Sequence, residues 1–271
     1  MADTAVVTPA SFGEELRRWR DARRYSQFAL AAAAAVSQRH LSFLETGRSK
    51  PSRDMVLHLA RTLELPLRDQ NVLLATAGYA SEYAERTLDD PGLNEVRHIL
   101  ETVVNARALI PAYVIDRGWD IVLANPAFAQ ITALSGIDLP SHIGLNAVRL
   151  CFHPEGIRPA MVDWERFATV LLHRLERDAL ERPFDARLAA LIEEARTYPD
   201  VADLPDRDPL PSGNDAMVPL VLETRAGQLR FISMIATIGG PSDVTVDELR
   251  LEMLLPVDRH TEAVLQREIC T

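Results

Sequence analysis

The sequence predicts a protein of two modules: an all-α segment of five short helices, followed by an α+β domain that contains an antiparallel sheet. Three observations support this division. The formal charge is +3 over residues 1–80 and −13 over the rest of the 271-residue chain, whose net charge is −10. Up to about residue 79, apolar residues recur with helical spacing. Beyond Pro111, short apolar runs separated by turn residues indicate strands.

The composition is that of an ordinary globular protein, with 47% hydrophobic and 25% charged residues. Its two cysteines, Cys151 and Cys270, cannot form a disulfide framework and are typical of a reducing compartment. The N-terminus lacks the pattern of a signal peptide, and no apolar run approaches the roughly 18 residues of a membrane span. We therefore expect a cytoplasmic protein without a membrane partner.

The first module, expected over residues 11–79, reads as five helices separated by short breaks. Three serines are suited to begin the second, third and fourth helices, because a serine hydroxyl accepts a hydrogen bond from the first helical turn. These residues are Ser26, Ser37 and Ser52. The fifth helix is expected over residues 67–77.

Two helices joined by a short turn, inside a compact helical domain, are the layout of a helix-turn-helix. If the third helix enters the major groove of DNA, its outward side chains meet the base edges. Amide, guanidinium and apolar side chains suit adenine, guanine and the thymine methyl group, respectively. The basic loop after this helix would contact phosphates, and Gln27 would either hold a phosphate or support a neighbouring side chain. The candidate DNA-binding residues are Gln27, Ser37, Gln38, Arg39, Ser42, Phe43, Arg48 and Lys50.

Residues 11–79 resemble the XRE/Cro-type helix-turn-helix of phage repressors. The matching stretches are Ser26-Gln27, Val36-Ser37-Gln38-Arg39, Leu44-Glu45-Thr46-Gly47-Arg48 and Pro51-Ser52. The resemblance implies an ion pair between Arg20 and Glu45, which would join the first helix to the third. The family usually carries glycine where this chain has Ala35, so we expect a strained or slightly different turn. Phe43 keeps two interpretations, a DNA contact or packing against a neighbouring helix.

The second module, expected over residues 109–271, follows a helical connector over residues 80–108. Its pattern is a two-stranded hairpin, several helices, a turn-rich loop over residues 203–215, three strands and a closing helix. This is the order of a PAS-like domain, in which helices cover one face of an antiparallel sheet. Such an architecture often encloses an apolar cavity.

The second half also resembles the ligand-binding domain of MmyB-like transcription regulators, over roughly residues 90–270. The matching stretches are Val114-Ile115-Asp116-Arg117-Gly118-Trp119-Asp120, Ala124-Asn125-Pro126-Ala127, Phe152-His153-Pro154-Glu155-Gly156 and Pro241-Ser242-Asp243-Val244-Thr245. The resemblance implies a pocket for a small apolar or fatty-acyl molecule.

A carboxylate buried in such a pocket would need a hydrogen-bond donor, and the remaining wall would be aromatic or aliphatic. Asn125 and His153 also have simple structural explanations, as a helix cap and as part of a loop. The candidate ligand-binding residues are Arg117, Trp119, Asn125, Phe128, Phe152, His153, Arg158, Phe231 and Met253.

The expected function is that of a sequence-specific transcription regulator, a homodimer that binds an inverted repeat in double-stranded DNA and responds to a small apolar ligand. The alternative is a constitutive repressor whose C-terminal domain serves only dimerisation or protein interaction. Cys151 and His153 are too few for a metal site, and a lone cysteine on an apolar helix is more often a core residue. The sequence also lacks a glycine-rich phosphate loop, GxSxG and HExxH. We expect no catalytic residue, metal or cofactor.

Overall fold

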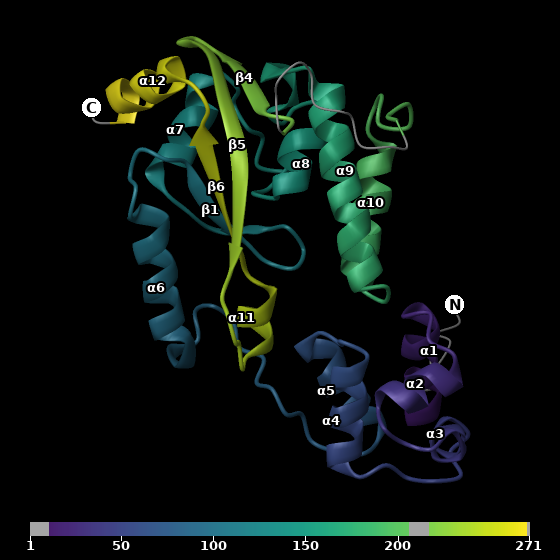
Figure 1. Cartoon of the computed structure of the whole chain (residues 1–271). Coiled ribbons are helices and arrows are strands. Elements are labelled where there is room, and N and C mark those ends of the chain that lie inside the picture. Colours follow the sequence, from purple (N-terminus) through teal and green to yellow (C-terminus); the bar gives the residue numbers. More distant parts are fainter. Residues whose placement is uncertain (1–10, 206–216, 270–271) are drawn as a thin grey trace, which may run out of the picture. The chain divides into compact units, whose positions relative to one another are not determined.

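A computed structural model describes residues 11–205 and 217–269, which form two compact units (Figure 1). The first unit holds the chain up to Arg86 together with residues 241–247, and the second holds residues 87–240 and the chain from Glu248. Most of the loop predicted over residues 203–215 lies outside the described residues. None of the described helices is long and apolar enough to cross a membrane.

The first unit contains the five predicted helices. They are α1 (Phe12–Ala22), α2 (Gln27–Ala33), α3 (Gln38–Glu45), α4 (Arg53–Thr62) and α5 (Leu67–Thr76). The predicted serine caps are present, since the hydroxyls of Ser26, Ser37 and Ser52 accept bonds of 3.0, 3.1 and 3.2 Å from backbone N–H groups three residues later. The helices enclose a fully buried apolar core, which includes Leu16, Trp19, Leu30, Leu41, Leu44, Leu59 and Leu73.

Residues 241–247, which lie far along the chain, also belong to the first unit. They include most of the short helix α11 (Val244–Glu248). Asp243 pairs with Ala84 in an isolated parallel bridge, and the side chain of Val244 is fully buried. This packing of a distant segment with the N-terminal helices was not predicted from the sequence.

The second unit is built on one antiparallel sheet of six strands in the order β2-β1-β6-β5-β4-β3. The strands are β1 (Ala112–Ile115), β2 (Ile121–Ala124), β3 (Met161–Val162), β4 (Leu220–Thr224), β5 (Gly227–Thr237) and β6 (Arg250–Pro256). This confirms the predicted α+β class, with the two-residue strand β3 as an addition. Among the central strands, Tyr113 of β1 lies opposite Glu252 of β6, and Ser233 of β5 lies opposite Leu254 of β6.

Helices lie on both faces of this sheet. They are α6 (Asn94–Asn105), α7 (Pro126–Leu134), α8 (Ala147–Phe152), α9 (Trp164–Glu181), α10 (Ala186–Thr197) and α12 (Arg259–Ile269), with short 3-10 turns at Pro91–Leu93 and Arg158–Ala160. Because side chains alternate along a strand, β1 contributes to two cores. Tyr113 and Ile115 face the main core beneath α7, α8, α9 and α10, whereas Ala112 and Val114 pack against α6 on the other face (Figure 1).

Candidate functional sites

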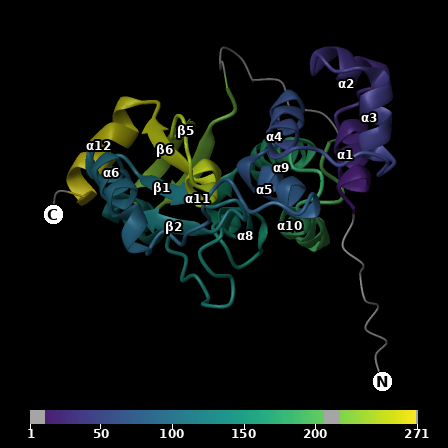
Figure 2. The ribbon, with the colours of Figure 1, turned by 90° about the horizontal axis from the view of Figure 1, so that it is seen from below.

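The turn between α2 and α3 places the candidate DNA-reading helix. Ala35 takes a left-handed conformation with φ 51°, which is the strained alternative of the two that we expected, at a cost on the order of 1 kcal/mol. The turn is held on both sides: Val36 N donates to Ala31 O at 2.9 Å, and the His58 ring lies 2.8 Å from Ala34 O. Helices α2 and α3 therefore pack side by side, as both views show (Figure 2).

A buried carboxylate joins α3 to α1 and α2. Oε1 of Glu45 accepts a 2.7 Å bond from Arg20 Nε, while Oε2 accepts 2.8 Å and 3.3 Å bonds from Gln27 Nε2 and Arg17 Nε. The ion pair that the family resemblance implied is thus present. Burial alone would raise the pKa of Glu45, but the bonds from Arg20 and Gln27 lower it below its ordinary value. Gln27 supports a neighbouring side chain here, one of its two expected roles.

The outer surface of α3 and of the loop after it is basic. Gln38, Arg39, Arg48 and Lys50 are exposed, and none of the three cations has an acidic ion-pair partner within the described residues. Such cations can contact phosphates or guanine without first breaking an internal pair.

Phe43 lies half-buried in the middle of this basic surface. The guanidinium carbons of Arg39 and Arg48 are 5.2 and 5.9 Å from the centre of its ring, which is cation–π distance. The ring thus orients two basic side chains. This role is neither the direct DNA contact nor the packing against a neighbouring helix that were the two interpretations of Phe43. Phe28 of α2 is also at the surface, with 70% of the residue exposed.

The second unit contains an apolar cavity between the sheet and helices α7, α8 and α9. The cavity is small, with a volume of about 50 Å³, and the whole space between its lining atoms, which includes open solvent, is about 590 Å³. Most of its wall is aliphatic or aromatic. The lining residues are Tyr113, Ile121, Phe128, Ile131, Thr132, Ser135, Ala147, Leu150, Cys151, Ile157, Phe167, Leu220, Leu222, Ser233, Glu252 and Leu254.

One end of this wall is polar and is formed by three strand residues, Tyr113, Ser233 and Glu252. Glu252 is only 4% exposed. Glu252 Oε1 accepts a 2.9 Å bond from Arg174 Nη1 of α9 and a short bond from the Ser233 hydroxyl. Burial, and then the negative charge of Glu252, raise the pKa of Tyr113 well above its ordinary value, so its hydroxyl stays protonated. Burial also raises the pKa of Cys151 to about 12, which keeps the thiol neutral and a poor nucleophile.

Of the nine residues predicted to bind a ligand, Phe128 lines this cavity. Phe152 and Phe231 are fully buried in the core, and Met253 packs on the opposite face of the sheet with α6. Trp119, also buried, lies 4.5 Å below the Arg174 guanidinium.

The predicted polar anchors are engaged in the fold itself. Arg117 forms ion pairs with Asp185 at 2.8 Å and with Glu248 at 3.5 Å. Asn125 caps α7 through Phe128 N at 3.0 Å and makes three further bonds to backbone groups, which use its whole amide. Arg158 stacks on the Trp164 ring at 3.6 Å and pairs with Asp200.

The polar end of the cavity was not predicted from the sequence. Glu252 interrupts the apolar run Leu249–Leu255 at a position that strand alternation places on the same face as Leu254. An acidic residue at an inward-facing position of a strand is a usable signal, because a buried carboxylate needs partners.

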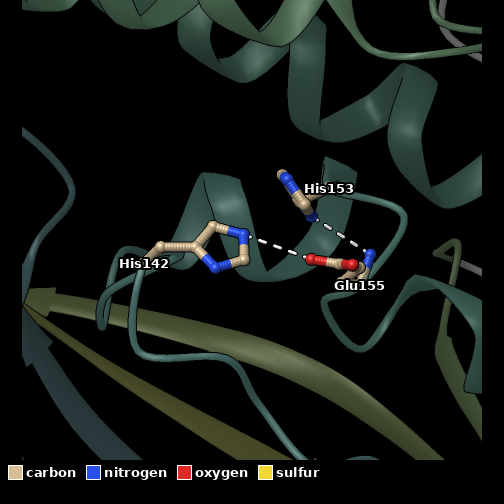
Figure 3. Close-up of side chains that lie close together, drawn as sticks. All are labelled: His142, His153 and Glu155. Atoms are coloured by element: carbon tan, nitrogen blue, oxygen red, sulfur yellow. Dashed lines mark hydrogen bonds and ion pairs between the residues drawn. The ribbon is translucent and has the colours of Figure 1, made fainter.

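His153 belongs to a different group, outside the cavity wall (Figure 3). His142 Nε2 lies 3.1 Å from Glu155 Oε2, and His153 Nδ1 accepts a 3.1 Å bond from the backbone N–H of Glu155. The three ligand atoms lie within 4.8 Å of one another, so this is the cluster in the described chain that could hold a metal ion. A metal bound through His153 Nδ1 would have to displace this N–H, and His142 and Glu155 are largely exposed. The cluster is therefore readily explained as a surface ion pair beside a loop bond.

These features define a class of protein. A helix-turn-helix is followed in the chain by an α+β domain with an apolar cavity, as in a transcription regulator. Its second helix, α3, and the loop after that helix carry cations that have no acidic ion-pair partner within the described part of the chain. Residues 11–73 match a helix-turn-helix domain, and residues 96–267 match the MmyB-like transcription regulator ligand binding domain. The second match covers more than half of the chain, which therefore belongs to the MmyB-like transcription regulators. A search of curated proteins found no match.

Proposed function

We propose that the protein is a homodimeric transcription regulator that binds an inverted repeat in double-stranded DNA and is controlled by a small apolar ligand in the cavity of its second unit. In a dimer, two copies of α3 would lie about one DNA turn apart, roughly 34 Å. Arg39, Arg48 and Lys50, which have no acidic ion-pair partner among the described residues, support a DNA contact by this helix and the loop after it.

The observation that carries ligand control is the path of the chain between β5 and β6. Ser233 in β5 and Glu252 in β6 belong to the cavity wall, and the segment 241–247 between these strands packs within the helical unit. A ligand that shifts either strand therefore acts on a segment that is part of the DNA-binding unit.

The contacts of this segment are specific. Val244 N donates to Ala84 O at 2.8 Å, and Arg86 Nη1 bonds Asp243 Oδ2 at 3.1 Å. Asp247 Oδ2 accepts a 3.4 Å bond from Leu67 N at the start of α5, where Pro66 provides no side-chain cap. An acidic group at a helix N-terminus is stabilising, so a change in this segment would be felt by α5.

An apolar stripe on α6 supports dimerisation. Ile99 and Val103 lie one turn apart on this helix and are 55% and 42% exposed. We expect Ile99→Asp to shift the chain toward the monomer in analytical ultracentrifugation, whereas the exposed polar Glu95→Gln should not. An unchanged sedimentation coefficient for both variants would place the dimer interface elsewhere.

The central experiment selects bound sequences from random duplex DNA with the full chain, then measures affinity for the recovered sequence with and without an apolar extract. We expect two half-sites about one turn apart, and an affinity change of about 5- to 150-fold with ligand. Recovery of no preferred sequence would refute DNA reading.

Variants separate ligand control from the alternative of a constitutive repressor. Asp243→Asn, which weakens the bond to Arg86, should keep the sequence preference and lose the ligand response. The exposed Asp138→Asn is the matched control and should keep both. If no extract changes the affinity of the unmodified chain, the constitutive alternative is favoured.

A further inference from the structure

The charge of the cavity wall restricts the head group of a ligand. Glu252 is the charged residue among those that line the cavity, and the other polar lining groups are hydroxyls and one thiol. Two of the hydroxyls are already engaged, since Thr132 and Ser135 donate to the backbone oxygens of Phe128 and Ile131 at 3.1 and 3.0 Å. Polar recognition is therefore concentrated at the end formed by Tyr113, Ser233 and Glu252.

Glu252 can accept a further hydrogen bond. Arg174 and Ser233 both donate to its Oε1, and the Tyr113 hydroxyl also donates to this carboxylate, which offers about four acceptor positions in all. A buried acceptor gains from a donor brought by a ligand, whereas a second carboxylate beside it would be repelled in a site of low dielectric.

Arg174 is the group that could reverse this preference. It is absent from the cavity wall, its guanidinium stacks on Trp119, and its Nη1 is bonded to Glu252. Its buried Nη2 has no hydrogen-bond partner among the described residues. Because Glu252 lines the cavity and Arg174 does not, a ligand head group at this end of the cavity contacts Glu252.

We propose that the cavity binds a small apolar molecule whose head group carries no negative charge and donates a hydrogen bond to Glu252, as an alcohol or a phenol does. The inference rests on the proposed ligand-controlled function for its biological meaning. The inference excludes a free fatty acid, which is one form of the fatty-acyl ligand that the family resemblance implied.

The test compares octan-1-ol, its methyl ether and octanoate as probes for the full chain, with dissociation constants from calorimetry. We expect octan-1-ol to bind at least about tenfold more tightly than octanoate, because the acid meets Glu252, and also more tightly than the ether, which lacks a donor. Ala147→Met, which fills the cavity, should abolish octan-1-ol binding. Binding that survives this variant would place the probe elsewhere and overturn the inference.

Glu252→Gln provides the reciprocal test. It leaves the positive charge of Arg174 uncompensated, so octanoate should gain about tenfold or more over octan-1-ol relative to the unmodified chain. The ranking of probes on the unmodified chain decides the question even if this variant does not fold. Equal or tighter binding of octanoate there, or binding of none of the probes, would overturn the head-group inference.

The outcome is separable from that of the proposed function. If octanoate binds most tightly and changes the affinity for DNA, the head-group inference is refuted and ligand control is supported. If octan-1-ol binds most tightly but does not change the affinity for DNA, the head-group inference is supported and ligand control by this class of ligand is refuted.

Discussion

The carboxylate of Glu45 is expected to hold the DNA-binding unit together, and Glu45→Gln tests this directly. The substitution keeps the shape of the side chain but removes the negative charge that faces Arg20. Arg20 is only 9% exposed. Removing one partner of a buried ion pair typically costs about 3–5 kcal/mol. Arg20 retains bonds to Asp21 and to Tyr25 O, so we expect a loss of about 2–4 kcal/mol in the free energy of unfolding of this unit.

The assay must distinguish the two units, because a single melting curve of the whole chain combines them. Hydrogen exchange of peptides from α1 and α3 reports on the first unit alone. A loss of 2–4 kcal/mol corresponds to a lower unfolding midpoint by roughly 10–25 °C for a domain of this size. The exposed Glu64→Gln is the matched control and should leave the midpoint unchanged. Equal protection in Glu45→Gln and the unmodified chain would refute a structural role for the pair.

The pH dependence gives the sign of the effect. The pKa of Glu45 is lowered in the folded chain from an ordinary value of 4.5, so its contribution to stability is fully present above pH 4.5 and is lost as the pH falls through the folded pKa. The stability difference between the unmodified chain and Glu45→Gln should therefore shrink as the pH falls below 4.5. A difference that stays constant down to pH 2 would mean that charge is not its cause.

Three further predictions concern the helical unit. Arg39→Ala should cost about 1–3 kcal/mol of DNA binding and relax one base preference, whereas Lys50→Ala should weaken binding to all sequences alike, as measured by affinity for a panel of duplexes. Gly13→Ala should destabilise the unit in denaturant titration, because the new Cβ would lie 2.4 Å from the backbone oxygen of Glu45. Ala35→Gly should stabilise it by about 1 kcal/mol, since glycine adopts the left-handed turn without strain; a destabilised variant would show that the turn is unstrained.

Local chemistry explains what the sequence could predict. Ser26 and Ser37 were identified as caps because capping depends on a few neighbouring residues. The strained turn at Ala35 was expected from the family resemblance, because the family usually carries glycine at this position. The strands around Tyr113 were visible as apolar runs, whereas Met161–Val162 is too short to stand out.

Long-range partners explain what the sequence could not predict. Arg117 was a reasonable ligand anchor until the fold brought Asp185 and Glu248 to it from distant parts of the chain. The cavity end was missed for the same reason, since Arg174 in α9 makes a buried Glu252 tolerable in β6. A single sequence does not reveal such pairs.

The coupling that ligand control requires is within reach of the segment 241–247. A regulator needs about 1–3 kcal/mol of coupling, and a typical hydrogen bond contributes about 0.5–1.5 kcal/mol, more when a charge is involved. The bonds of Asp243 to Arg86 and of Asp247 to Leu67 are therefore sufficient in size if a ligand makes or breaks both. Linkage also requires reciprocity: DNA must change the affinity for the ligand by the same factor as the ligand changes the affinity for DNA. A ligand that shifts β5 and β6 without altering these bonds would have equal affinity for both states of the helical unit, and it would regulate nothing however tightly it bound.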